Sequence, residues 1–329
     1  MSQGVGTAGG DPAQVPPRMT DSHPVRFVLE VLRGIAQVDF MPSALCGAVF
    51  LAALFVSGWR FGLYGLLGAA VATATAHALE IDHELVGAGL RGFNGCLIGT
   101  GFAVFLGPSH LSTFFLAVFA SSLVVVVTSA LAIMLGTWNV PTFTMPFCLV
   151  TSVMTVGAPG FEKAWHAAHG LAALPAPVTG PTALTWQQTW HGFFANFGQI
   201  FFMPQWYVGL MFLVGIALAN RLAAVMACVG SATAMVVAVL LGSPATDVAQ
   251  GLMGYNAVLV AMALCGVFIA PSPWSLTYAI GGAGASTVLT SALNSFVAPF
   301  GGHAFTWPFV LTAVLFVAAV PSIPRLQRT

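Results

Sequence analysis

Two pairs of polar side chains occupy matched places in the two halves of an otherwise apolar chain. Gln37 and Gln199 each lie shortly before a Met-Pro pair, and Thr144 and Thr306 each lie two residues before a proline; both pairs are 162 positions apart. A proline removes a backbone donor and frees a carbonyl one turn earlier. Backbone freed at membrane depth is tolerated only where it is buried in protein or lines a cavity. A symmetric pair of amides beside symmetric breaks therefore suits the axis of a pore.

Both polar pairs also have a simpler explanation. A glutamine at a helix end can bond a neighbouring helix, and a threonine in a membrane helix often bonds back to its own helix. The repeated register favours the pore interpretation for Gln37 and Gln199. For Thr144 and Thr306, the residues alone leave the two explanations equally open.

A third matched block interrupts each half at positions 92–94 and 254–256, where the sequence is Gly-Phe-Asn and then Gly-Tyr-Asn. Glycine permits a kink or a close helix contact, and asparagine can cap a broken helix end. We interpret Asn94 and Asn256 as structural. An apolar residue follows each aromatic one by four positions and so shares its helical face. By itself this spacing is more typical of packing than of a binding slot. The two pairs are Phe93 with Leu97, and Tyr255 with Leu259.

The composition restricts the class of protein. Of 329 residues, 58% are hydrophobic and 5% are charged, against roughly a quarter charged in a soluble domain. The net charge is zero, which gives no reason to expect nucleic-acid binding. Five cysteines lie in apolar stretches without a C-x-x-C spacing, so we expect neither a disulfide framework nor a cysteine metal site. The chain is predicted to be an integral membrane protein.

The apolar segments predict an all-α polytopic fold of ten transmembrane helices in two inverted five-helix repeats. Five spans in each repeat is an odd number, so the second repeat must enter from the opposite face of the membrane. Two short half-helices, re-entrant or interfacial, precede the spans at 26–37 and 189–199. The spans are expected at 43–58, 61–79, 85–106, 111–136 and 142–157, then at 205–219, 222–241, 247–270, 274–298 and 304–321.

The expected organisation has five segments. They are a disordered cytoplasmic tail at 1–25, the first inverted repeat at 26–157, a connecting loop at 158–188, the second inverted repeat at 189–321, and a C-terminal tail at 322–329. Arginines flank the first and last apolar segments, and cytoplasmic loops are enriched in such residues. We therefore expect both termini to be cytoplasmic and the chain to be integral to the cell membrane, inner or plasma. These arginines are Arg18, Arg26, Arg33, Arg325 and Arg328.

The matched blocks resemble the urea transporter family in its bacterial and vertebrate members. The specific motifs are Gly-Leu-x-Gly-Phe/Tyr-Asn and Phe-Thr-x-Pro-Phe, each present twice, and the resemblance runs from about 26 to 320. It implies passive, channel-like urea transport without enzymatic activity, coupling ion, metal or cofactor. It also implies a homotrimer in the bilayer with a separate pore through each protomer.

The resemblance assigns a selectivity filter to matched positions. Oxygen acceptors would come in part from Gln37, Gln199, Thr144 and Thr306. One flat apolar slot would be formed by Phe40, Phe93 and Leu97, and the other by Ile200, Tyr255 and Leu259. Urea is planar, neutral and rich in N–H donors, so oxygens along its edges could replace its water, while a hydrogen bond left unreplaced would cost several kcal/mol.

Several alternatives stay open. Short amides are close analogues of urea, and ammonium channels share the inverted plan, although no histidine recurs here at the 162-residue separation. An intramembrane enzyme would need a nucleophile–base pair or a metal set inside the spans. A cluster between the second and third spans is expected to be a solvated loop rather than a metal site. Its members are His77, Glu80, Asp82, His83 and Glu84.

Asp39 departs from the pattern. It follows Gln37 by two positions, where the second half has the apolar Phe201. Acidic side chains inside a membrane are costly and usually functional. We therefore expect Asp39 to face the vestibule or to pair with an arginine.

Overall fold

The structure is a computed structural model that describes residues 23–164 and 180–329. Within these ranges the regular structure is helical, and the only extended pairing is an isolated bridge between Ile269 and Arg328. The predicted all-α class is confirmed. Most of the predicted N-terminal tail (1–22) and the middle of the predicted connecting loop (165–179) lie outside the described residues.

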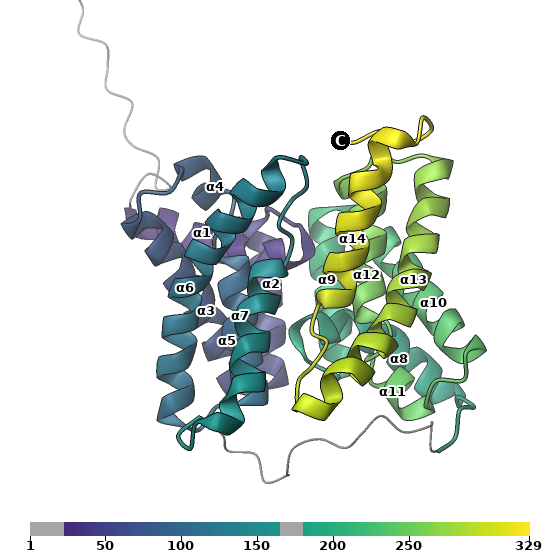
Figure 1. Cartoon of the computed structure of the whole chain (residues 1–329), viewed down its shortest axis with the longest axis horizontal. Helices are drawn as coiled ribbons and strands as arrows, with labels where there is room; N and C mark the ends of the chain where they lie inside the picture. The colour runs from purple at the N-terminus through teal and green to yellow at the C-terminus, as the bar shows by residue number, and fades with distance from the viewer. Residues whose placement is uncertain (1–22, 165–179) are drawn as a thin grey trace, which may run out of the picture.

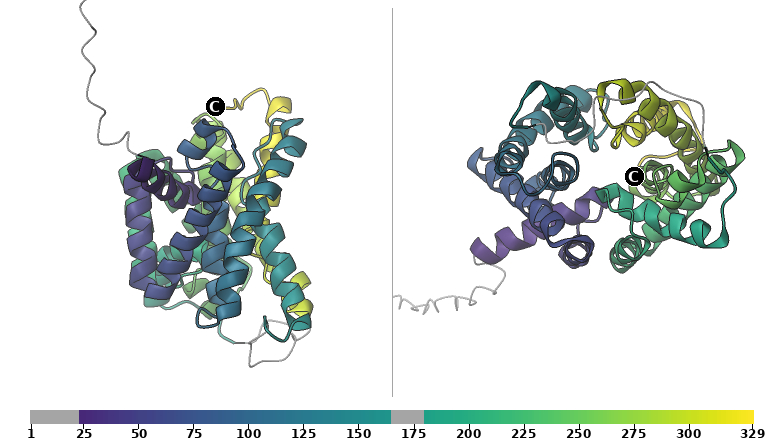
Figure 2. Two further views of the ribbon diagram at one scale, coloured as in Figure 1. Left: turned by 90° about the vertical axis from the view of Figure 1, so that its left-hand side faces the viewer. Right: turned by 90° about the horizontal axis from the view of Figure 1, so that it is seen from below.

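The two halves of the chain form two series of helices that lie side by side (Figures 1 and 2). The first series is α1 (His23–Ala36), α2 (Ala44–Ser57), α3 (Trp59–Ala78), α4 (His83–Gly87), α5 (Phe93–Phe105), α6 (Leu111–Gly136) and α7 (Met145–Gly157). The second is α8 (Trp186–Gly198), α9 (Trp206–Ala219), α10 (Arg221–Leu240), α11 (Ala245–Ala249), α12 (Tyr255–Met262), α13 (Pro273–Val297) and α14 (Trp307–Ala319).

Each helix of the first series has a counterpart in the second. Helices α9 to α14 begin 162 positions after α2 to α7, and α8 begins 163 positions after α1. In Figure 1, α1 and α4 lie at the upper edge of the molecule, whereas their counterparts α8 and α11 lie at the lower edge. The C-terminus lies at the same upper edge as α1.

The helices are not ten straight helices that are each long enough to span a membrane. Three helices, α3, α6 and α10, are long and apolar enough to cross a membrane by themselves. The number rises to five if the bent pairs α1–α2 and α8–α9 each count as one span, with bends of 77° and 73°. These bends fall at the predicted Met-Pro breaks. The remaining apolar helices include the short α5, α7, α12 and α14.

The span expected at 85–106 is divided. Helix α4 ends at Gly87, and α5 starts only at Phe93. The chain between them turns at Gly89, which has a φ of 81°, and a Cβ at this position would stand 2.5 Å from the backbone carbon of Arg33. Its counterpart Gly251 has a φ of 76°. Only glycine adopts this conformation readily while allowing such close packing, so the turn holds the start of α5 against α1.

Small residues allow the helices of each half to approach closely. A Cβ at Gly47 in α2 would lie 1.8 Å from the carbonyl oxygen of Leu32 in α1. At the equivalent Gly209 in α9, the distance to the Phe194 oxygen would be 1.9 Å. Close contact at small residues is the usual way in which membrane helices associate. The bent pair in each half is therefore held by the same backbone contact.

Candidate functional site

Thr144 and Thr306 meet in the interior of the protein. Their Oγ1 atoms are 2.7 Å apart, and both side chains are buried. Thr144 is the N-cap residue of α7, and Thr306 is the N-cap residue of α14. The first turn of each helix contains the proline that follows the threonine by two positions. The preceding residues, Phe143 and Phe305, adopt positive φ values of 48° and 46°. This turn ends the incoming loop and directs both helix N-termini toward a common centre.

Cys148 adds a third polar group to this centre. It lies one turn after Thr144 on α7, and its Sγ atom is 3.1 Å from Oγ1 of Thr306. The equivalent residue in the second half is the apolar Val310. The centre is therefore symmetric in its two hydroxyl groups and asymmetric in its thiol.

Two asparagines hold the ends of these helices. Oδ1 of Asn94 accepts a hydrogen bond from the Phe147 backbone N–H at 3.2 Å. Asn256 bonds the Phe309 N–H at the same distance. The first N–H groups of a helix have no partner within it, so a side-chain acceptor from another helix satisfies them. The interpretation of both asparagines as caps for broken helix ends is confirmed.

The paired glutamines make equivalent contacts. Nε2 of Gln37 donates to the carbonyl oxygen of Ala88, and Nε2 of Gln199 donates to that of Gln250, both at 2.9 Å. Each amide thus fixes the loop that leads into α5 or α12. Because the NH₂ group is used in this way, the carboxamide oxygen remains as the acceptor end of each side chain.

Phe40 follows the first half-helix in a left-handed conformation, with a φ of 64°. Its ring centroid lies 5.9 Å from that of Phe309 and 5.6 Å from that of Phe268. In the second half, the residue with the equivalent turn is Phe202, which has a φ of 66°. Its ring lies 6.0 Å from Phe147 and 5.4 Å from Phe105.

The repeat favours a residue other than Ile200 as the counterpart of Phe40. Ile200 is fully buried within the short 3-10 turn at Gln199–Phe201. Its counterpart at 162 positions is Val38, not Phe40. The residue that matches Phe40 in sequence position, backbone conformation and aromatic neighbours is Phe202.

The contact between Phe40 and Phe268 depends on an irregular turn at the end of α12. The turn at Ala263–Val267 is kinked, with non-helical backbone at Cys265 and Gly266, and the Phe268 N–H bonds to the carbonyl oxygen of Ala263, five residues earlier. The chain from the start of α12 to Phe268 is one residue longer than the chain from the start of α5 to Phe105. Phe268 therefore takes the place that Phe105 has in the other half, although the two are 163 positions apart rather than 162. Sequence comparison missed Phe268 for this reason.

The four remaining predicted slot residues come from α5 and α12. Phe93 and Tyr255 are 8% and 7% exposed, while Leu97 and Leu259 are fully buried. The Tyr255 hydroxyl donates to the carbonyl oxygen of Phe305 at 2.5 Å, and the same oxygen accepts from Nδ2 of Asn256 at 3.4 Å. The hydroxyl that Phe93 lacks thus bonds the backbone next to Thr306.

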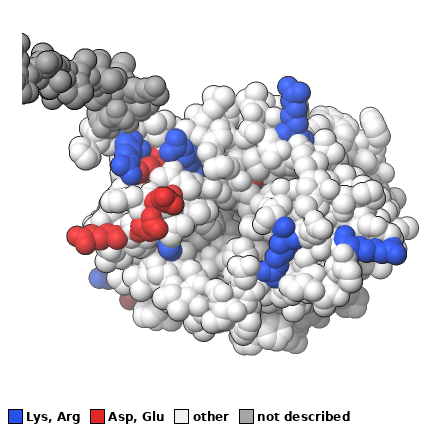
Figure 3. Space-filling model, turned by 90° about the horizontal axis from the view of Figure 1, so that it is seen from above, with Lys and Arg blue, Asp and Glu red and all other residues white. Residues whose placement is uncertain are grey.

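A cavity of about 520 Å³ leads toward the threonine pair. Its lining includes Gln37, Phe40, Phe93 and Thr144, four of the predicted site residues. It lies between the first-half loops and the end of α12. Seen from above, the molecule is hollowed near its middle, with charged side chains around the hollow (Figure 3). We call this cavity the vestibule.

Asp39 lies where neither expectation placed it. Its side chain is fully buried and is absent from the vestibule lining. Neither carboxyl oxygen has a hydrogen-bond partner among residues 23–164 and 180–329, so pairing with a described arginine is also excluded. The counterpart Phe201 stacks on Phe212, with ring centroids 4.4 Å apart and nearly parallel planes. Asp39 thus replaces a packed aromatic residue.

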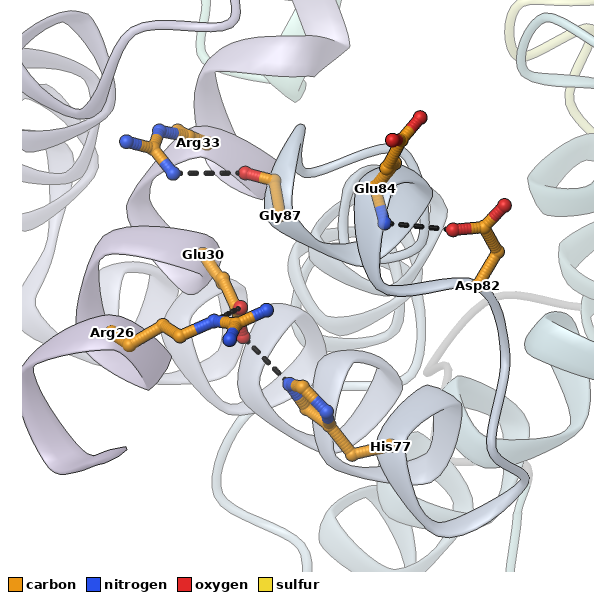
Figure 4. A network of polar contacts seen from close by, with 7 residues as sticks. All are labelled: Arg26, Glu30, Arg33, His77, Asp82, Glu84 and Gly87. Carbon is orange, nitrogen blue, oxygen red and sulfur yellow. Dashed lines mark hydrogen bonds and ion pairs between the residues drawn. The ribbon is translucent and has the colours of Figure 1, made fainter. Parts of the chain in front are cut away.

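The polar cluster beside α4 has a structural role (Figure 4). Glu30 is only 1% exposed and accepts hydrogen bonds from Nε of Arg26 at 2.9 Å and Nε2 of His77 at 2.6 Å. Asp82 caps α4 by accepting from the Glu84 N–H. No group of three metal-binding side chains occurs in the described part of the chain. Glu30, which sequence reasoning missed, links α1 to α3 through His77.

Comparison with known proteins agrees with this architecture. Residues 28–321 match the urea transporter family. The chain is 30% identical over 311 residues to urea transporter 1 of Capra hircus and of Ovis aries, which covers 92% of this chain and 80% of each relative. Identity to urea transporter 1 of Rattus norvegicus is 29% over the same length. The chain therefore belongs to the urea transporter family, whose members are membrane transport proteins and not enzymes.

Proposed function

We propose that this protein carries urea passively across the membrane, through a pore in each protomer. The observation that carries the proposal is the meeting of Thr144 and Thr306, with Oγ1 atoms 2.7 Å apart at the end of the vestibule. Hydroxyl groups from the two halves converge there between aromatic and aliphatic side chains. Such a centre offers hydrogen bonds and a flat apolar passage, and it contains no ionisable carboxylate or histidine pair among the described contacts of the threonines.

The proposed path uses each residue according to its chemistry. Gln37, Gln199, Thr144 and Thr306 supply acceptors to the N–H groups along the edges of urea. Apolar side chains contact its two faces, since a planar solute that has shed its water fits a narrow slot. The first slot is formed by Phe40, Phe93 and Leu97, and the second by Phe202, Tyr255 and Leu259. Phe202 takes the part first given to Ile200.

The membrane arrangement is part of the proposal. Ten spans in two inverted repeats, at about 26–157 and 189–321, agree with the equal spacing of α2–α7 and α9–α14 and with the opposite placement of α1 and α8 (Figure 1). Cytoplasmic termini agree with the arginines near both ends. A homotrimer in the bilayer is proposed from the family relationship.

The proposal is tested by stopped-flow light scattering on proteoliposomes that contain the purified protein. Urea efflux should exceed that of empty liposomes and exceed the flux of methylammonium. It should not depend on membrane potential, and it should be nearly constant between mildly acidic and mildly basic pH, because no charged pair contacts the threonines within residues 23–164 and 180–329. Transport of methylammonium in preference to urea, or a steep dependence on potential, would overturn it.

A further inference from the structure

Arg91 places a positive charge in the lining of the vestibule. It is the second residue before α5, whose first residue is the slot residue Phe93, and both residues line the same cavity. Nη1 of Arg91 lies 3.4 Å from Oγ of Ser129, which is a long hydrogen bond. Nε is buried without a hydrogen-bond partner among the described residues. The side chain is therefore held at the cavity wall by few contacts.

The charge of Arg91 has no acidic counterpart in contact. Across residues 23–164 and 180–329, the ion pairs within 4.0 Å all involve Glu30, with Arg26 or His77. Asp82, the acid that interacts electrostatically with Arg91, lies beyond that distance. The residue equivalent to Arg91 in the second half is Met253. The positive charge at position 91 is therefore present in the first half only and is not repeated in the second half.

A second arginine adds positive charge beside the vestibule. Arg328 donates from Nη1 to the carbonyl oxygen of Asn139, a vestibule residue, and from Nη2 to that of Val317, both at 2.7 Å. It also forms no ion pair among the described residues. Asp82 offsets the charge of Arg91 only from beyond ion-pair distance. Positive charge at the wall of a cleft with apolar sides raises the local potential, because low-dielectric walls focus the field.

We propose that Arg91 is a specificity-determining residue that keeps cations shaped like urea out of the pathway. The inference rests on the proposed function. Guanidinium is also planar and carries N–H donors at its edges, so flat slots lined by oxygen acceptors would suit it as well as urea. Charge does separate them, and Arg91 supplies like charge where a solute approaches Phe40 and Phe93. Urea, being neutral, meets no such repulsion.

The experiment compares guanidinium with urea in proteoliposomes. Two readouts are the guanidinium-to-urea permeability ratio, from uptake of radiolabelled solutes, and the concentration of guanidinium that halves urea efflux. Arg91→Met introduces the residue of the other half, and Arg91→Gln removes the charge while keeping a polar group. Both variants should raise the guanidinium-to-urea permeability ratio about five- to tenfold, which corresponds to about 1 to 1.4 kcal/mol. If guanidinium binds without passing, both should instead lower its half-inhibitory concentration by the same factor.

Two variants separate charge from shape and fold. Arg91→Lys keeps the charge and should behave as the parent protein. Arg60→Leu, which introduces the equivalent residue Leu222 at an exposed position in the first turn of α3, outside the vestibule, should change neither readout. The inference would be overturned if both readouts stayed within twofold of the parent protein in Arg91→Met and Arg91→Gln. It would also be overturned if Arg91→Lys shifted the readouts as much as these two neutral variants do. Failure of the parent protein to conduct urea would instead reject the proposed function.

Discussion

Thr144 and Thr306 bond directly to each other through their side chains, with Oγ1 atoms 2.7 Å apart, although 162 residues separate them in the chain. One hydroxyl donates and the other accepts, so in this state each has a polar partner. A solute that passes between them must replace this bond with bonds of its own. The pair therefore forms a polar barrier that a hydrogen-bonding solute can open without leaving an unpaired group.

Replacing either threonine by valine should slow urea transport. Valine keeps the volume but removes an acceptor where the solute has shed its water, and an unsatisfied group of this kind costs about 1–3 kcal/mol. At about 1.4 kcal/mol per tenfold, urea flux should fall roughly five- to hundredfold if this step limits transport. Stopped-flow efflux from proteoliposomes measures the change for Thr144→Val and Thr306→Val.

Thr287→Val is the matched control for the threonine variants. Thr287 is also buried, but its Oγ1 bonds to the carbonyl oxygen of Ala283 on its own helix. Its loss should leave the flux nearly unchanged. Equal, small effects at Thr144, Thr306 and Thr287 would show that the central hydroxyl pair does not set the barrier.

A mercurial that reaches the centre should block transport through Cys148. Its Sγ atom is 3.1 Å from Oγ1 of Thr306, so a bound mercury atom would obstruct the space between the threonines. We expect inhibition of the parent protein and full flux after treatment of Cys148→Ser, measured by urea efflux with and without the reagent. Block that persists in Cys148→Ser would assign it to another cysteine, of which Cys96 is also on a central helix.

The Tyr255 hydroxyl should affect the choice between urea and amides. It donates a hydrogen bond of 2.5 Å to the carbonyl oxygen of Phe305, the residue before Thr306. Tyr255→Phe leaves this oxygen with only the longer bond from Asn256, so it can accept an N–H of a solute. One added hydrogen bond contributes about 0.5–1.5 kcal/mol, and urea has twice as many N–H groups as acetamide. The urea-to-acetamide permeability ratio should therefore rise about two- to tenfold.

The reverse substitution in the first half tests the same idea. Phe93→Tyr introduces the hydroxyl at the equivalent position of α5, where the neighbouring carbonyl belongs to Phe143. It should lower the urea-to-acetamide ratio. Unchanged ratios in both Tyr255→Phe and Phe93→Tyr would show that these carbonyls take no part in binding the solute.

Removing the carboxyl group of Asp39 should stabilise the protein. The side chain is fully buried, and its oxygens have no partner among the described residues. Asp39→Leu preserves much of the volume and removes the polar group, which should add about 1–3 kcal/mol and raise the midpoint of thermal unfolding in detergent. Glu162→Leu, at an exposed position, should shift the midpoint little. A lower midpoint for Asp39→Leu would mean that the carboxyl makes a favourable interaction in the folded protein.

The close contact of α1 with α2 should not tolerate a larger residue. A Cβ at Gly47 would stand 1.8 Å from the carbonyl oxygen of Leu32, so Gly47→Ala must separate the helices, at about 1–3 kcal/mol or more. Gly209→Ala should have a similar effect in the second half. Gly281→Ala on α13 meets nothing within 4 Å and should be neutral or slightly stabilising. Thermal unfolding in detergent compares the three, and equal midpoints would contradict the packing argument.

The sequence alone determined the class of protein and the internal repeat. An excess of apolar residues requires a membrane, whatever the packing of the helices. The matched pairs Gln37/Gln199 and Thr144/Thr306 stand at a constant separation of 162 positions. These features depend on residue type and order along the chain, which the sequence contains in full.

Only the tertiary structure decided which side chains meet, within each half and between the halves. Phe268 reaches Phe40 because the irregular turn at Ala263–Val267 shifts the register by one residue. The 162-residue repeat does not indicate this shift. Glu30 pairs with His77, whereas Asp39 and Arg91 form no ion pair within 4.0 Å in the described chain. Helix packing fixes such contacts through local bends and single-residue insertions, and these displace side chains by several ångströms while leaving the pattern of the sequence unchanged.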